Sequence, residues 1–173
     1  RGRWGASNSY SAPSAARRRP ARIRMKMNSL LDPPAIRALY RASQAGVRVD
    51  LNVRGICALR PGVSGVSDNI EVVSVVGRFP EHSRIFSFER DGEERIYIGS
   101  ADLMPRNLDR RVEALVPIED PALMTRLDEI LDVNLADDTL AWTLQPDTTW
   151  VRVQGTEGVD THRRLEELAL ERR

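Results

Sequence analysis

The amino-acid sequence predicts an α/β fold in which helices flank one mixed, mostly parallel β-sheet. Residues 22–27 alternate polar and apolar side chains, which is the period of a half-buried strand, and residues 47–53 alternate again. A helical segment with short connections lies between them. Strand, helix and strand joined in this way form a βαβ unit whose two strands run parallel.

The helix of this unit has its own start and stop signals. Asp32 is a good N-cap residue, and Pro33 after it is favoured at the first helical position. Leu39 and Tyr40 lie on one face of the expected helix. Gly46 then suits the C′ position, where the backbone turns left-handed.

The second half of the chain predicts more strands and two more helices. Asp91-Gly92 is a strong hairpin signal between two strand-like segments, and Asp120-Pro121 repeats the helix-start signature. The tail after Gln145 is polar, with apolar residues at a spacing that indicates a short helix. The expected strands are residues 70–76, 84–89, 95–99 and 112–118, and the short helix spans residues 161–172.

Composition bounds the protein to an ordinary globular chain. It has 173 residues, 41% hydrophobic and 29% charged, and a net charge of +1, so a basic site must arise from local clustering. No apolar run approaches the ~18 residues of a membrane span. The one cysteine, Cys57, excludes an internal disulfide and favours a packing role. We expect a disordered or non-native tail over residues 1–20, a domain over 21–153, and a polar tail over 154–173.

One of the two histidines has neighbours suited to phosphoryl chemistry. His82 precedes an expected strand, Arg84 follows two residues later, and the hairpin returns to a small-residue turn that ends in Asp102. A histidine transfers protons or attacks, a guanidinium neutralises phosphate oxygens, and small residues let backbone N–H groups approach a ligand. His162 lies among arginines in the polar tail, and we expect it to be solvated.

These residues also carry a resemblance to a known family. His-x-Arg followed by Gly-Ser-x-Asp resembles the phospholipase D motif, His-x-Lys followed by Gly-Ser-x-Asn. More specific blocks resemble polyphosphate kinases of the phospholipase-D-like type, and they occur in that family's order. The blocks are residues 26–30, 53–62, 67–70, 77–84 and 100–113. The family usually has Trp where Leu103 stands, and residues 1–19 resemble nothing in it.

The resemblance implies a reversible transfer of the terminal phosphate of ATP to inorganic polyphosphate, with Mg²⁺. It implies two phospholipase-D-like domains facing each other over a tunnel, of which this chain is the second. The first domain, with the phosphorylated histidine and most of the Mg²⁺ site, is then missing, and we expect this fragment to be inactive alone. The implied partners are ATP or ADP, polyphosphate, the missing domains and further copies in a homo-oligomer. We expect neither nucleic-acid binding nor a membrane span. We expect a cytoplasmic location, peripheral to the inner membrane face.

Particular residues take roles from the same resemblance. His82 corresponds to the histidine that faces the nucleotide phosphates and acts as the acid for the departing group. Arg54 corresponds to an ATP-contacting arginine and Arg111 to a tunnel-lining arginine. Lys26 and Glu113 lie in matching blocks without a defined role. No metal ligand is assigned in this chain. On general grounds alone, surface salt bridges are the competing interpretation for Arg54 and Arg111.

Two other functions stay open. In the first alternative, the chain is a phospholipase-D-like nuclease or phosphodiesterase, and each copy in a dimer supplies one histidine. In the second alternative, the chain is a non-catalytic remnant that binds polyphosphate. We further expect that a domain without its partner exposes apolar surface and self-associates.

Overall fold

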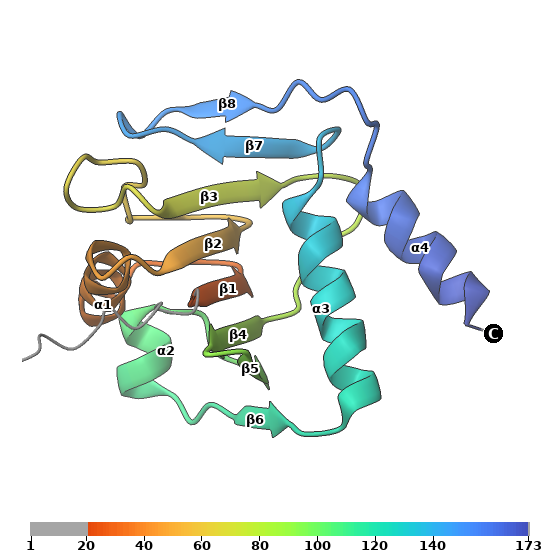
Figure 1. Ribbon diagram of the computed structural model, residues 1–173, viewed down its shortest axis with the longest axis horizontal. Helices are drawn as coiled ribbons and strands as arrows, with labels where there is room; N and C mark the ends of the chain where they lie inside the picture. Colours follow the sequence, from red (N-terminus) through yellow and green to blue (C-terminus); the bar gives the residue numbers. More distant parts are fainter. Residues whose placement is uncertain (1–20, 173) are drawn as a thin grey trace, which may run out of the picture.

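The computed structural model describes residues 21–172. One eight-stranded sheet runs through them in the order β6-β5-β4-β1-β2-β3-β7-β8, with helices packed against it (Figure 1). The strands are β1 (Arg22–Met27), β2 (Arg48–Val53), β3 (Ile70–Val75), β4 (Ile85–Arg90), β5 (Glu93–Gly99), β6 (Leu115–Ile118), β7 (Ala141–Leu144) and β8 (Trp150–Arg152). The helices are α1 (Pro33–Gln44), α2 (Pro105–Arg110), α3 (Pro121–Leu135) and α4 (Thr161–Glu171).

The mixed sheet is confirmed, but its mostly parallel character is wrong. β1 pairs parallel with β2, and β2 with β3, as the βαβ pattern predicts. The other five pairings, β1–β4, β4–β5, β5–β6, β3–β7 and β7–β8, are antiparallel. Two of these pairs, β4–β5 and β7–β8, are consecutive strands joined by short connections, and a short connection returns the chain antiparallel.

Local signals place several element ends where the sequence predicts them. Asp32 caps α1 through a hydrogen bond from the backbone N–H of Ala35, and Gly46 has φ +86° just beyond the helix. Asp91 and Gly92 both have positive φ, as a tight hairpin between twisted strands requires. Residues 112–114, expected in a strand, lie before β6, which begins at Leu115. The sequence analysis missed α2, β7 and β8 because three to six residues carry little periodicity.

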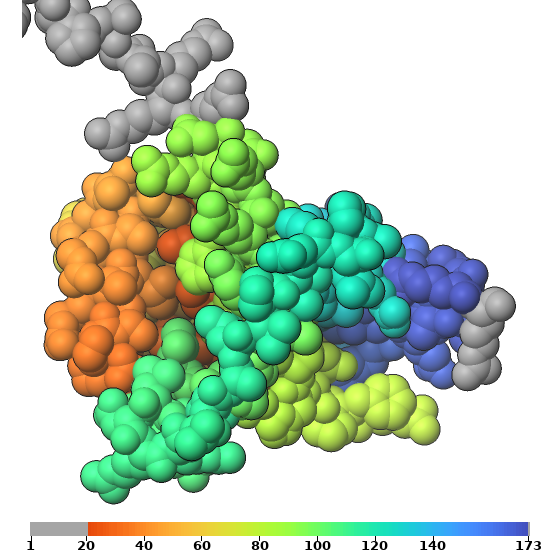
Figure 2. Space-filling view, turned by 90° about the horizontal axis from the view of Figure 1, so that it is seen from below, coloured from red at the N-terminus to blue at the C-terminus, as the bar shows by residue number. Residues whose placement is uncertain are grey.

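The period of two along β1 divides its side chains between the two faces of the sheet. Met25 and Met27 enter the main apolar core with Leu51 of β2 and Leu39 of α1. Arg24 lies on the opposite face and reaches α3. Figure 2 shows the result from one edge: α1 (orange) and α3 (cyan) lie on either side, and β1 (red) is visible only in the narrow space between neighbouring elements.

An ion network around the buried Arg24 side chain joins this second face to α3. The Arg24 guanidinium donates to Asp128, to Asp132 at 2.9 Å and to Glu94 at 2.5 Å. Burial raises the pKa of Asp128 to about 6, and the hydrogen bond with Glu94 adds to this, although Arg24 opposes it. Next to the network, the side-chain amide of Asn52 donates to Asn134 of α3 at 2.8 Å.

The raised pKa of Asp128 predicts how stability changes with pH. The pKa of the folded state exceeds the value near 3.9 of an unfolded aspartate, so the folded state binds this proton more tightly. The contribution of Asp128 is therefore fully present below about pH 4 and is lost as the pH rises through about 6. We expect Asp128→Asn, which stays neutral, to gain stability relative to the parent chain between pH 5 and pH 7.5. Urea unfolding at both pH values measures this, with the exposed Asp109→Asn as control. A parent-to-variant difference independent of pH would contradict the assignment.

Candidate functional site

The predicted site residues meet at one edge of the sheet. β1 and β2 end at this edge, β4 begins there, and β5 returns to it, because β5 runs antiparallel to β4. Arg54 follows β2 directly, and Arg84 directly precedes β4. Asp102 follows β5 after a short turn. In open α/β sheets, ligands bind outside the carboxyl ends of the parallel strands, which is the edge where these side chains lie.

A bidentate ion pair between Arg84 and Asp102 holds this edge together. Arg84 Nε donates to Asp102 Oδ1 at 3.0 Å, and Nη2 donates to Oδ2 at 2.9 Å. The backbone N–H of Asn28, just past β1, also donates to Oδ1 at 2.8 Å. Burial by itself would raise the pKa of Asp102, but the hydrogen bonds from Arg84 and Asn28 outweigh it and leave the pKa below its ordinary value.

The third nitrogen of the same guanidinium determines which ring nitrogen of a neutral His82 carries the proton. Arg84 Nη1 lies 2.9 Å from His82 Nδ1. A guanidinium has no acceptor atom and stays protonated, so Nδ1 must be the acceptor. A neutral His82 therefore carries its proton on Nε2. The His82 side chain is exposed, and within residues 21–172 Nε2 has no hydrogen-bond partner. A donor is thus presented toward solvent at the sheet edge.

Lys26 is a buried cation that the sequence analysis left without a role. It lies at the end of β1, on the face opposite Met27, and 3% of its side chain is exposed. Its ammonium is 3.2 Å from Glu81 Oε2 and 3.0 Å from Ser83 Oγ, the two residues that flank His82. Burial lowers the pKa of Lys26; Glu81 opposes this, while the positive charges of Arg54 and Arg84 lower it further. A lysine inside a strand otherwise rich in core residues was the available signal.

Arg54 lies within electrostatic range of this ammonium. Its backbone N–H donates to the carbonyl of Met27, and its own carbonyl accepts from Ser74 Oγ, so the backbone is fixed between β1 and β3. Its guanidinium makes no hydrogen bond or ion pair within residues 21–172. The surface salt bridge that competed with a ligand role is therefore not found in this part of the chain.

Arg111 is positioned differently. Its Nε lies 3.4 Å from Glu113 Oε1, and 61% of its side chain is exposed. Glu113 also accepts hydrogen bonds from Ser100 Oγ and from Asn107 Nδ2, and these lower its pKa. The positive charge of Arg84 acts on Glu113 as well, so the carboxylate connects Arg111 to the edge that holds His82. Here the ion pair that competed with a ligand role is present.

Two other arginines, Arg60 and Arg78, have structural partners. Arg60 donates to the carbonyl of Pro146, and Arg78 lies over the Phe79 ring at 5.1 Å. The expectation for His162 is wrong: it is 7% exposed, because α4 folds back against the loop that begins at Gly77. The polar residues around it in sequence hid this packing.

The side chains of residues 21–172 do not form a preformed metal-binding site. No group of three or more His, Cys, Asp or Glu side chains comes together there in a way that would hold one. Asp102 at the edge already balances Arg84. Mg²⁺ in phosphoryl-transfer sites keeps several waters and binds largely through substrate phosphates. The side chains of residues 21–172 therefore do not provide a metal site by themselves.

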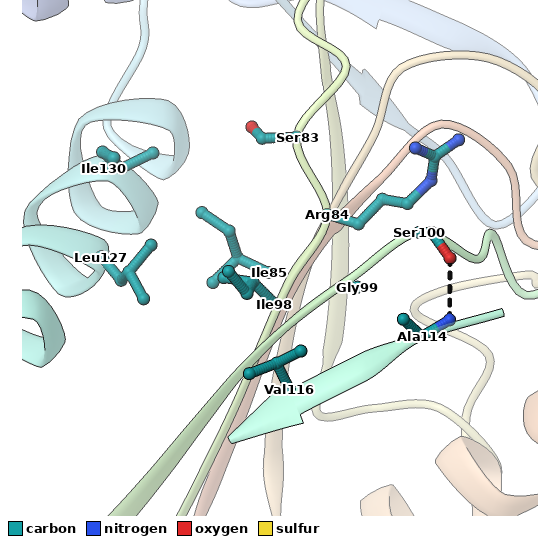
Figure 3. A pocket seen from close by; sticks show the side chains of 10 residues that line it. All are labelled: Ser83, Arg84, Ile85, Ile98, Gly99, Ser100, Ala114, Val116, Leu127 and Ile130. Carbon is teal, nitrogen blue, oxygen red and sulfur yellow. Dashed lines mark hydrogen bonds between the residues drawn. The ribbon is translucent and has the colours of Figure 1, made fainter. Parts of the chain in front are cut away.

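An apolar hollow of about 410 Å³ lies between α3 and the β4–β6 side of the sheet. Leu127 and Ile130 line it from α3, and Ile85, Ile98 and Val116 line it from the strands (Figure 3). The guanidinium of Arg84 points away from these side chains. The hollow adjoins the cation-lined edge at Ser83 and Arg84, but most of its lining is apolar and does not suit phosphate.

Comparison with known proteins identifies the family. The sequence model described as polyphosphate kinase C-terminal domain 2 matches residues 9–164. The chain belongs to this family. The expectation that residues 1–19 resemble nothing in the family is therefore wrong from residue 9 onward. The match extends past residues 21–153 at both ends. Its first part lies outside the described residues, as does the expected disordered tail over residues 1–20.

Relatives and solved structures agree with the family match. A polyphosphate kinase from Thermosynechococcus vestitus is 60% identical over 139 residues, which are 80% of this chain and 19% of that protein. The chain thus spans about a fifth of the length of the curated relatives that it matches. The crystal structure of polyphosphate kinase from Porphyromonas gingivalis superposes with a TM-score of 0.85 at 36% identity, covering 88% of this chain and 24% of the other. NucT from Helicobacter pylori shares the fold alone, with a TM-score of 0.50 at 12% identity over 66% of this chain and 78% of the other.

In residues 21–172, no helix is long and apolar enough to cross a bilayer.

Removing the charge of Asp102 should destabilise the chain. Asp102→Asn leaves the buried Arg84 without a carboxylate and weakens the acceptor for Asn28, so we expect a loss of roughly 3 kcal/mol in the free energy of unfolding. Urea unfolding at pH 7 measures the loss, with the exposed Glu119→Gln as control. Equal stabilities of Asp102→Asn and the parent would show that the ion pair does not hold the edge together.

The Lys26–Glu81 pair predicts a measurable coupling energy. Lys26→Met and Glu81→Gln each remove one charge of a partly buried pair, and the double variant removes both. We expect the two effects to be non-additive by roughly 1–2 kcal/mol in urea unfolding. Additive effects would place the two side chains in separate environments and contradict the contact.

Proposed function

We propose that this chain binds the phosphates of ATP and of inorganic polyphosphate, as the second phospholipase-D-like half of a polyphosphate kinase. The reaction is the reversible transfer of the terminal phosphate of ATP to the polyphosphate chain. Family membership supports the reaction. The observation that carries the site is the convergence of Lys26, Arg54 and Arg84 beside His82 at one edge of the sheet.

The arrangement suits phosphoryl transfer because that reaction depends on positioning and on charge neutralisation. The Lys26 and Arg84 cations are already matched by Glu81 and Asp102. Arg54 carries a positive charge without a partner in residues 21–172, so it is the guanidinium available for phosphate oxygens. Arg111 approaches the same substrates from the α2 side once phosphate competes with Glu113.

We assign to His82 the role of general acid. When ATP is the donor, the bond between its β–γ bridging oxygen and the terminal phosphorus breaks, and the phosphorus bonds to the acceptor. The bridging oxygen then gains negative charge on the departing ADP. His82 Nε2–H is the donor that the hydrogen bond from Arg84 leaves available, and it stabilises or protonates that oxygen. In the reverse direction Nε2 takes the proton back.

The same hydrogen bond argues against His82 as the attacking residue. Attack on phosphorus needs an unprotonated ring nitrogen, and Nδ1 already faces Arg84. The phosphorylated histidine is accordingly assigned to the first phospholipase-D-like domain. That domain also provides most of the Mg²⁺ site, and Mg²⁺ supplies charge neutralisation on the transferring phosphate. The intact enzyme is assigned to the cytoplasm, peripheral to the inner membrane face, as a homo-oligomer.

Binding of polyphosphate tests the site on this chain alone. We expect Arg54→Ala to weaken the binding of long-chain polyphosphate about tenfold, because it removes a charge-assisted contact. Isothermal titration at low and high salt measures the effect, and salt should reduce the affinity. Arg126→Ala, on the exposed part of α3, is the matched control. Equal losses of polyphosphate affinity in the two variants would show that Arg54 contributes only through its general positive charge and not through a specific contact.

Turnover then distinguishes the competing functions. The assay follows ATP formation from ADP, Mg²⁺ and polyphosphate with this chain and with His82→Ala. A silent chain agrees with a missing first domain, whereas turnover abolished by His82→Ala would make His82 the phosphorylated residue and overturn its role as acid. Cleavage of DNA that added polyphosphate does not inhibit would favour the nuclease. Polyphosphate binding that depends on Arg54 but not His82, with no turnover after the missing domains are supplied, would favour the non-catalytic remnant.

A further inference from the structure

The loop that carries His82 depends on side chains for its conformation. It connects β3 to β4, and residues 77–83 take part in no backbone-to-backbone hydrogen bond with the described chain. Its backbone instead meets three side chains. Lys26 and Arg84 approach the carbonyls of Ser83 and His82, near the end of the loop. Near its start, the backbone N–H of Phe79 donates to Nδ1 of His162 at 3.3 Å.

His162 fits closely against the start of this loop. A Cβ atom added to Gly77 would lie 2.8 Å from Cε1 and Nδ1 of the His162 ring, so no other residue fits there without movement. The rings of His162 and Phe79 are 5.4 Å apart at 53°. His162 is 7% exposed although it belongs to the first turn of α4. The close approach of the His162 ring to the loop backbone thus depends on the glycine at position 77 and on the position of His162 at the start of α4.

The beginning of α4 is itself fixed. The backbone N–H of Thr161 donates to Asp137 Oδ2 at 2.8 Å, and Thr161 Oγ1 donates to the carbonyl of Val133 at 3.3 Å. Asp160 caps the helix through the N–H of Arg163. These contacts connect the start of α4 to the end of α3 and the turn after it, and they hold the His162 backbone in place beside the loop.

Packing alone does not account for a histidine at this position. Since Nδ1 accepts from a backbone N–H, the ring proton of neutral His162 is on Nε2. Nε2 is buried and has no partner among residues 21–172. A buried donor without a partner is unfavourable, and an apolar side chain would avoid the cost. What the ring provides and an apolar side chain lacks is the acceptor at Nδ1.

We propose that His162 is a positioning residue for His82. It fixes the first part of the loop from α4, while Lys26 of β1 and Arg84, just before β4, fix the last part. The proposal rests on the assignment of His82 to the reaction, and it makes α4 a component of the functional unit.

Two substitutions at one position separate the acceptor from the packing. The side-chain oxygen of asparagine lies close to the place of Nδ1, so His162→Asn keeps an acceptor, whereas His162→Leu removes it. In the free chain we expect His162→Leu to speed hydrogen exchange of the Phe79 amide about tenfold. We also expect it to shift the NMR signals of the His82 ring and to weaken polyphosphate binding severalfold. His162→Asn should restore most of each property.

Further variants keep every outcome decisive. Gly77→Ala places a Cβ against the His162 ring and against Leu140, so it should displace the ring and reproduce the effects of His162→Leu, also if His162→Leu fails to fold. Glu166→Leu, exposed on α4, should change none of them. Unchanged His82 ring signals in Gly77→Ala, and in His162→Leu where that variant folds, would overturn the proposal. If the parent chain binds no polyphosphate, the proposed function fails, yet the His82 signals still decide whether His162 positions the loop.

Discussion

The ion pair between Arg84 and Asp102 joins segments that are distant in the sequence. Arg84 precedes β4, Asp102 follows β5, and the N–H of Asn28 beyond β1 donates to the same carboxylate. Three strand ends are therefore fixed by one acidic side chain. A guanidinium has a rigid fork of donors, so the two bonds to Asp102 also determine where the third nitrogen points. That nitrogen meets His82, and the orientation of a histidine at the surface thus depends on a buried pair.

Two kinds of cation meet at this edge of the sheet. Lys26 and Arg84 have carboxylate partners and organise the protein, whereas Arg54 has none in residues 21–172 and is the cation that we propose for the ligand. The paired cations still contribute, because their positive charges lower the pKa of neighbouring groups and their bonds define the loop around His82. An anion that enters the edge meets a site whose geometry exists before binding. Preorganised charge of this kind avoids the cost of reorienting dipoles during a reaction.

The sequence predicted the first βαβ unit, the hairpin and the helix starts well, because each depends on residues close in the chain. Asp32, Gly46 and Asp91-Gly92 act within a few residues of themselves. It also predicted that His82, Arg84 and Asp102 meet, because a hairpin is the shortest way to bring residues 82–84 next to residue 102. It did not predict the share of antiparallel strands, the burial of His162 or the pairing of Lys26 with Glu81. These depend on which segments become neighbours across the whole sheet, and local patterns do not contain that information.

The alternation along β1 has a consequence for how this domain tolerates change over evolutionary time. Met25 and Met27 complete the apolar core on one face, while Arg24 and Lys26 serve the α3 network and the loop around His82 on the other. Because the period is two, inserting or deleting a single residue in β1 would exchange the faces and bury the wrong set on each side. Substitutions can accumulate at these positions one at a time, but length changes cannot. Lineages of this domain should therefore differ in the loops on either side of β1 and keep the length of the strand itself.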